Sequence, residues 1–138
     1  MHPPHFIGPE RLAVLHRRKG SATVRDMPTF FAALEEVRQP LEPVFCGGPS
    51  RSLQDREQWS SACNFFAVRP GVVLTYARNE ATIGELEKVG FRAMSDATLV
   101  AGPDLPAGRA VITLEASELV RGGGGPRCMT LPLRREDP

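Results

Sequence analysis

The 138-residue chain lacks the features by which several large classes of protein are recognised. Its seventeen basic and sixteen acidic residues leave a formal charge of +1, so no charge surplus favours nucleic acid or an anionic membrane surface. One Trp and one Tyr are too few for a platform on which unpaired bases could stack. No apolar run approaches the length of a membrane span. We therefore expect no nucleic-acid partner and no membrane partner.

The cysteines are few as well. Cys46, Cys63 and Cys128 are odd in number and irregularly spaced, so they do not suggest a disulfide framework. No secretory signal is visible, because no basic segment followed by an apolar stretch occurs at the N-terminus. We expect a cytoplasmic protein with reduced thiols. Cys46 and Cys63 are interpreted as packed or motif-filling residues, not as a disulfide or metal pair.

One stretch near the C-terminus has a composition that core packing does not explain. The four consecutive glycines Gly122–Gly125 cost backbone entropy, but they let the main chain line a ligand with its own N–H and C=O groups. Cys128 follows them, and Arg121 and Arg127 supply positive charge that favours the thiolate, the reactive form of cysteine. A phosphate-binding loop is disfavoured, because no Lys-Ser or Lys-Thr pair closes the run. The residues alone leave a second interpretation equally open, a flexible linker before a strand that contains an ordinary buried cysteine.

The first third of the chain predicts a strand, a helix and a second strand. Leu12–Leu15 is a short apolar run typical of a buried strand. A helix is expected to start with Asp26 as its cap and a proline in its first turn, because apolar residues recur at helical spacing over 30–37. Pro40 ends this helix, and Val44–Cys46 is expected to form a short strand.

The remainder predicts a hairpin, a helix and further short strands. Asn64–Val68 and Val72–Tyr76 are apolar segments separated by a Pro-Gly turn, as in a hairpin. Asn79 is placed to cap a helix that Gly90 ends. The later elements are a strand at Phe91–Met94, a short element at Thr98–Val100 and a strand at Ala110–Leu114. Helices that alternate with small mixed sheets indicate the α/β fold class.

Two segments resemble those of one enzyme family. Arg121 to Leu133, together with Ser117-Glu118-Leu119, resembles the C-terminal signature of arginine deiminases, in which a glycine-rich loop precedes the nucleophilic cysteine. Arg56 to Asn64 looks like the family segment Arg-Glu-Gln-Trp-x-x-Gly-x-Asn. The resemblance covers nearly the whole chain from about Phe6 onward. It implies a partial pentein, an α/β propeller, of which residues 1–138 would be the C-terminal part with about two of the five blades.

The resemblance also implies a reaction, the hydrolysis of L-arginine to citrulline and ammonia. Carboxylates hold the guanidinium, Cys128 attacks its carbon to give a covalent thiouronium, a histidine protonates the leaving ammonia, and water releases citrulline. Cys128 is thus the expected catalytic residue, and Gly122 and Gly123 are the expected substrate-binding residues. Arginine is the expected substrate, and no metal or organic cofactor is implied. Three residues, Arg56, Glu57 and Trp59, are similar to motif residues that hold blades together.

The chain departs from the family pattern at several positions. Gly47-Gly48-Pro49 has a proline where the family's Gly-Gly-Asp has a carboxylate, and Ala62 or Cys63 replaces a motif glycine. Gly123 stands where some members carry a substrate-contacting arginine. The binding carboxylates and the His-x-Asp pair of the family precede the portion that this sequence matches. We therefore expect the 138-residue chain to be inactive by itself.

Two alternatives stay open. The chain could be a non-catalytic shortened pentein module with an interaction or regulatory role, or a relative of amidinotransferases or methylarginine hydrolases, which share the cysteine and the fold. A further expectation concerns assembly. About two blades of a propeller leave open sheet edges and an unpaired apolar flank, so we expect a homo-oligomer, in the simplest case a symmetric dimer.

Overall fold

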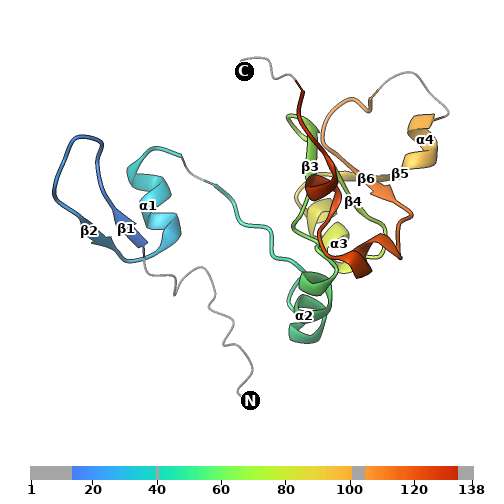
Figure 1. Ribbon diagram of the computed structural model, residues 1–138, viewed down its shortest axis with the longest axis horizontal. Helices are drawn as coiled ribbons and strands as arrows, with labels where there is room; N and C mark the ends of the chain where they lie inside the picture. The colour runs from blue at the N-terminus through green and yellow to red at the C-terminus, as the bar shows by residue number, and fades with distance from the viewer. Residues whose placement is uncertain (1–13, 40, 101–104, 134–138) are drawn as a thin grey trace. The chain divides into compact units, whose positions relative to one another are not determined.

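A computed structural model gives the structure of the chain and describes residues 14–39, 41–100 and 105–133 (Figure 1). The chain divides into two compact units, Met1–Pro43 and Val44–Pro138, which are described one at a time below. Both contain strands and helices, and the α/β class is confirmed. In the described part of the chain, every helix is too short or too polar to cross a membrane.

The N-terminal unit is a two-stranded antiparallel sheet followed by a helix. Strand β1 (Val14–His16) pairs with β2 (Arg25–Met27), and α1 (Phe30–Glu36) comes next. The predicted first strand is therefore present, although Leu12 and Ala13 lie outside the described residues, as does Pro40. The strand is not buried as expected, because Leu15 is 68% exposed.

The predicted start of α1 is wrong. Asp26 lies in β2 opposite Leu15, and the helix is capped by Thr29, whose Oγ1 accepts a hydrogen bond from the main-chain N–H of Ala32 at 3.0 Å. Asp26 and Thr29 are both good cap residues. Thr29 caps because β2 continues to Met27, the residue before Pro28, and Thr29 itself has the extended backbone of a cap residue.

The C-terminal unit is built on a four-stranded mixed sheet with the strand order β3-β4-β6-β5. Its strands are β3 (Phe66–Arg69), β4 (Val72–Tyr76), β5 (Arg92–Ser95) and β6 (Ala110–Leu114). The predicted hairpin is confirmed, because β3 and β4 are antiparallel and Gly71 lies in the turn with φ +81. The pairs β4–β6 and β5–β6 are parallel, and parallel neighbours need crossover connections. Helices α3 (Glu80–Lys88) and α4 (Asp96–Val100) lie in these connections.

The core lies on the two faces of β6, which like β4 is paired on both sides. Side chains alternate along a strand, so Ala110 and Ile112 face one way and Val111 the other. Ile112 packs with Leu99 of α4 and residues of β4 and β5, whereas Val111 packs with Ile83 and Leu86 of α3. Such burial on both faces explains why β6 begins with three consecutive apolar residues, Ala110–Ile112.

Two predictions about the segment before the sheet are corrected. Val44–Cys46 is not a strand: the chain turns there, with Gly48 N bonded to Phe45 O at 3.2 Å and Gly47 at φ +71. A Cβ on Gly47 would lie 2.4 Å from the main-chain nitrogen of Gln54, so only glycine fits. Helix α2 (Arg51–Trp59) follows the turn and was not predicted. Its sequence is too polar to show an apolar stripe.

Helix α3 begins after Asn79 and is followed by Gly90 at φ +90, as predicted. The side chain of Asn79 makes no cap hydrogen bond, however, which corrects the expected role. It is buried, donates to Ser60 O at 3.3 Å and accepts from the Ser60 hydroxyl. The end of α2 is thereby fixed to the start of α3.

Candidate active site

Cys128 lies in a single 3₁₀ turn, Pro126–Met129, that packs against β3 and β4 of the C-terminal unit (Figure 1). The turn starts with proline, whose fixed φ suits a first helical position. Cys128 is exposed and is a free thiol. The interpretation as a buried cysteine within a strand is therefore wrong, and the thiol is accessible to a reactant from solvent.

The glycine run divides into two pairs with different surroundings. A Cβ on Gly124, which has φ +83, would lie 3.0 Å from the Cβ of Cys128, and one on Gly125 would lie 2.6 Å from the Cβ of Asn64. Only glycine lets the turn approach these side chains so closely. Gly122 and Gly123 have open space where a Cβ would stand, with no atom within 4 Å. They stay candidate substrate contacts, because space for a ligand adjoins their main-chain groups.

Asn64 connects the turn to the segment that follows α2. Its Nδ2 donates to the Sγ of Cys128 at 2.9 Å, and its Oδ1 accepts from the main-chain N–H of Cys128 at 3.2 Å. Its carbonyl oxygen also accepts from Arg127 N at 3.3 Å. Sequence reasoning placed Asn64 in a family-like motif but not in the site. Its place at the end of that motif was the available signal.

Hydrogen-bond donors make the Cys128 thiol more acidic. The main-chain N–H of Gly125 and then the Asn64 amide lower the pKa of Cys128 below its usual value. Burial opposes them in part, and the charge of Arg127, the smallest contribution, lowers the pKa further. The predicted contribution of Arg127 is thus present. Arg121 instead forms a surface ion pair with Glu118, Nε to Oε2 at 3.2 Å. Both side chains of this pair are exposed, so it contributes little to the order of the loop.

Tyr76 lies behind the turn at the end of β4. It is 1% exposed, and its hydroxyl lies 3.9 Å from the Sδ of Met129. Burial and the neighbouring charge of Cys128 raise the pKa of Tyr76. The buried ring thus contacts the turn that carries Cys128 through Met129.

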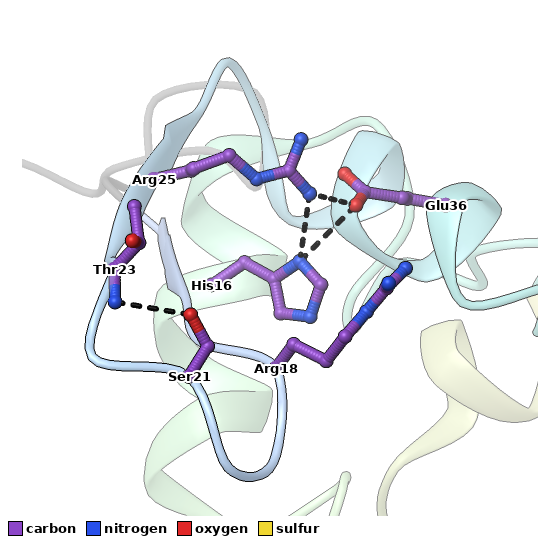
Figure 2. Close-up of a pocket in the computed structure, with 6 residues that line it drawn as sticks. All are labelled: His16, Arg18, Ser21, Thr23, Arg25 and Glu36. Atoms are coloured by element: carbon purple, nitrogen blue, oxygen red, sulfur yellow. Dashed lines mark hydrogen bonds and ion pairs between the residues drawn. The ribbon is translucent and has the colours of Figure 1, made fainter.

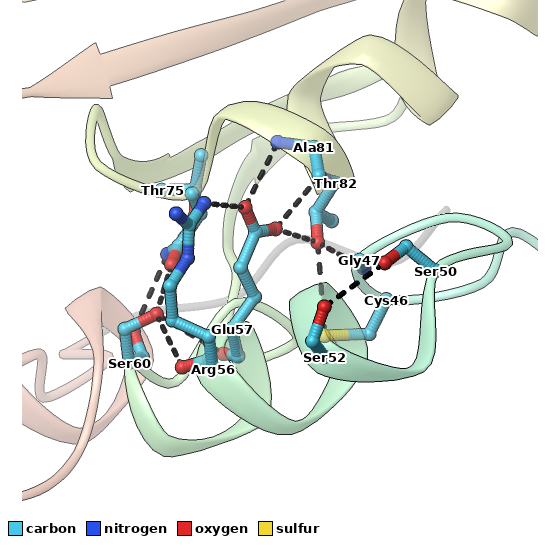
Figure 3. Close-up of polar contacts among 11 residues, drawn as sticks. Cys46, Gly47, Ser50, Ser52, Arg56, Glu57, Ser60, Thr75, Ala81 and Thr82 are labelled. Atoms are coloured by element: carbon cyan, nitrogen blue, oxygen red, sulfur yellow. Dashed lines mark hydrogen bonds and ion pairs between the residues drawn. The ribbon is translucent and has the colours of Figure 1, made fainter.

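A buried carboxylate fixes α2, and with it the segment that leads to Asn64 (Figure 3). Glu57 is fully buried, and its two oxygens accept from the main-chain N–H groups of Ala81 at 2.9 Å and Thr82 at 2.8 Å, which lie in the first turn of α3. The carboxylate thus caps the N-terminus of α3, the role expected of Asn79. The helix dipole is positive at this end and favours the negative charge. Burial would raise the pKa of Glu57, but the bonds from Thr82, Ala81 and Arg56 outweigh burial and lower it.

The hydroxyl of Thr82 extends this cluster to the glycine turn. It donates to Oε2 of Glu57 at 2.6 Å and accepts from Gly47 N at 2.9 Å. Arg56 pairs with Glu57 at 3.1 Å within α2, whereas Glu57 joins α2 to α3. Trp59 is 88% exposed and joins no elements within the described residues.

The other two thiols lie beside this cluster. Cys46 and Cys63 are both free; Cys46 is half-buried but Cys63 is exposed, so the interpretation of Cys63 as a packed residue is wrong. Burial of its sulfur, the neighbouring Cys46 and the charge of Glu57 raise the pKa of Cys63 to about 11. In the described ranges, no three His, Cys, Asp or Glu side chains are grouped closely enough to hold a metal ion.

A separate polar pocket of about 350 Å³ lies in the N-terminal unit (Figure 2). Its lining residues are His16, Arg18, Ser21, Thr23, Arg25 and Glu36. Glu36 of α1 pairs with Arg25 and lies 3.3 Å from Nδ1 of His16. These pairs hold the helix to the two strands, and the pocket contains no nucleophilic thiol.

Comparisons with known proteins identify the family to which the chain is similar. The family model described as arginine deiminase matches residues 15–135. The arginine deiminase of Mycoplasma capricolum is 45% identical over 97 residues, or 70% of this chain, and that of Streptococcus uberis is 38% identical over 99 residues, or 72%. The arginine deiminase of Treponema denticola is 32% identical over 142 residues, covering 97% of this chain.

The matches cover only part of each relative. They span 20% of the Mycoplasma and Streptococcus proteins and 30% of the Treponema protein. The match to the family model nevertheless includes the glycine run, Cys128 and Asn64. The chain belongs to the arginine deiminase family.

Proposed function

We propose that this chain supplies the nucleophile of an arginine deiminase-type hydrolase, with Cys128 as the catalytic residue. The observation that carries the proposal is an exposed thiol with a lowered pKa, held by N–H donors from Gly125 and Asn64 inside the region that matches the family. A lowered pKa increases the share of thiolate at any given pH, and the thiolate is the form that attacks carbon.

The reaction proceeds in two displacements at one carbon. The Cys128 sulfur adds to the guanidinium carbon of arginine, and ammonia departs with a proton from a histidine, which leaves a thiouronium on the sulfur. Water then adds to the same carbon and the C–S bond breaks, which releases citrulline and returns the thiolate. The same N–H donors serve both displacements, because a stabilised thiolate is both more abundant and a better leaving group.

The glycine loop supplies the wall of the substrate site in this proposal. Open space adjoins Gly122 and Gly123, so their main-chain groups are free of side-chain cover. Positioning matters because attack requires the guanidinium carbon to lie roughly 3–3.5 Å from the sulfur. The proposed chemistry needs no metal or organic cofactor.

The remaining groups come from outside this sequence. The chain spans 20–30% of its curated relatives, and it contains no carboxylate or histidine that the family pattern assigns to guanidinium binding or proton transfer. We place the 138 residues in a cytoplasmic pentein propeller as its C-terminal blades. By itself the chain is expected to produce no citrulline, because removal of cooperating catalytic groups leaves at most residual activity.

The test is citrulline formation by the longest polypeptide that carries this sequence in its native source. Arginine is the substrate, and Cys128→Ala is compared with Cys46→Ala as a matched thiol control. We expect turnover in the unmodified protein and in Cys46→Ala, and none in Cys128→Ala. Turnover that survives Cys128→Ala, or its absence from the unmodified protein, would reject the proposal.

A further inference from the structure

The side chain of Asn64 contacts Cys128, and the proposed function assigns no role to this contact. It lies 64 residues before Cys128 in the chain, and its side-chain amide meets both the sulfur and the main chain of that residue. This approach of Asn64 to Cys128 depends on glycine at position 125, because any side chain on residue 125 would collide with Asn64. The close approach is therefore built into the turn.

The oxygen and the nitrogen of the Asn64 amide bind different atoms of Cys128. Oδ1 accepts from the Cys128 main-chain N–H at 3.2 Å, which leaves the Nδ2 end of the group facing the sulfur at 2.9 Å. Nδ2 can only donate, so its partner must be a sulfur lone pair. A donor to sulfur favours the thiolate over the thiol, and an amide keeps its protons across the whole pH range in which the enzyme could work.

We propose that Asn64 is a positioning residue for Cys128, which holds the thiolate and fixes the direction from which the sulfur meets the guanidinium carbon. The role rests on the proposed function of Cys128. It acts through the nucleophile, and no contact with substrate is required of Asn64.

Two substitutions separate this role from a purely structural one. Asn64→Asp keeps an oxygen for the Cys128 N–H but replaces the donor to sulfur by a negative oxygen. Asn64→Ala removes both contacts. Each variant keeps the main-chain bond from Arg127 N to residue 64 O. Gln58→Ala is the matched control, because Gln58 is an exposed residue of the same motif.

The measurement is the pH dependence of Cys128 alkylation by iodoacetamide in the purified 138-residue chain, followed by peptide mass mapping. We expect the pKa of Cys128 to rise in Asn64→Ala and to rise further in Asn64→Asp, with alkylation at pH 7 slowed several-fold, and Gln58→Ala to match the unmodified chain. A profile for Asn64→Asp like that of the unmodified chain, with only Asn64→Ala shifted, would show that the bond to the main chain alone matters. An unshifted Asn64→Ala would show that the amide does not hold the thiolate. Unfolding of both variants would also overturn the proposal, since Asn64 would then be structural.

The readout involves no arginine and no turnover, so its failure is distinct from that of the proposed function. If Cys128 is the nucleophile but Asn64 has no role, the citrulline assay depends on Cys128 and the alkylation profiles coincide. If Cys128 is not the nucleophile, turnover survives Cys128→Ala, whatever the profiles show.

Discussion

The three thiols have environments that differ enough to predict an order of reactivity. Burial, the neighbouring Cys46 and Glu57 raise the pKa of Cys63 to about 11, whereas N–H donors lower that of Cys128. Thiolate is the alkylated form, so Cys128 should be labelled first when the native chain is treated briefly with iodoacetamide. Mass mapping of the labelled peptides measures this. Faster labelling of Cys46 or Cys63 would count against the assignment of the nucleophile.

Glu57 should make stability depend on pH. Its folded-state pKa is lowered, so its contribution is complete above the unfolded-state pKa, about 4.3 for a glutamate, and is lost as pH falls through the lower folded-state value. Glu57→Gln should remove this dependence. It should also cost about 1–3 kcal/mol at neutral pH, because one buried N–H of α3 loses its acceptor.

Urea unfolding followed at several pH values measures both effects of Glu57→Gln. The control is Glu87→Gln, an exposed position on α3, which should stay within about 0.5 kcal/mol of the unmodified chain. Equal stability of the two variants would contradict the assigned role of Glu57.

Single residues were predictable where their chemistry is local. The glycine run and the thiol stand next to each other in the sequence, so a local pattern made Cys128 a candidate, although the residues alone left a second interpretation equally open. Asn64 and Glu57 act across 64 and 25 positions through contacts that no local pattern encodes. Glu57 was placed in a motif, but its burial at the first turn of α3 depends on the tertiary arrangement.

The two halves of the glycine loop should respond differently to substitution. Gly125→Ala forces a methyl group against Asn64, and relief of such a clash typically costs about 1–3 kcal/mol. It should also weaken the bonds at the sulfur and raise the pKa of Cys128. Gly122→Ala has open space and should leave both stability and alkylation unchanged. Thermal unfolding and the alkylation profile compare the two, and an equal effect of both substitutions would refute this division of the loop.

Secondary structure followed the sequence where the pattern was strong. The hairpin of β3 and β4 has a Pro-Gly turn, and α3 has an apolar stripe that ends in a glycine, so both were predicted. Helix α2 was missed because its sequence is largely polar and its hold on the protein comes through Glu57. The start of α1 was misplaced because two good caps, Asp26 and Thr29, stand three residues apart.

The C-terminal unit has the exposed surface expected of part of a larger assembly. Strands β3 and β5 are the edges of its sheet. Trp59, Val100 and Leu131 are 88%, 90% and 80% exposed. Open edges and exposed apolar side chains favour pairing with another copy.

We therefore predict that the purified 138-residue chain self-associates, with a symmetric dimer as the simplest form. Light scattering over a range of concentrations measures the mass. A charge on the edge strand, as in Val68→Lys, should weaken association. A chain that stays monomeric at high concentration would refute the prediction.

The most direct test of the account is to trap the covalent intermediate. The longest native polypeptide that carries this sequence is mixed with arginine, quenched in acid within its first turnovers, digested and analysed by mass. The account predicts that the peptide containing Cys128 gains the mass of arginine less ammonia, and that neither Cys128→Ala nor the unmodified protein without arginine shows this gain. Citrulline production with no adduct on Cys128, or an adduct on another residue, would contradict it.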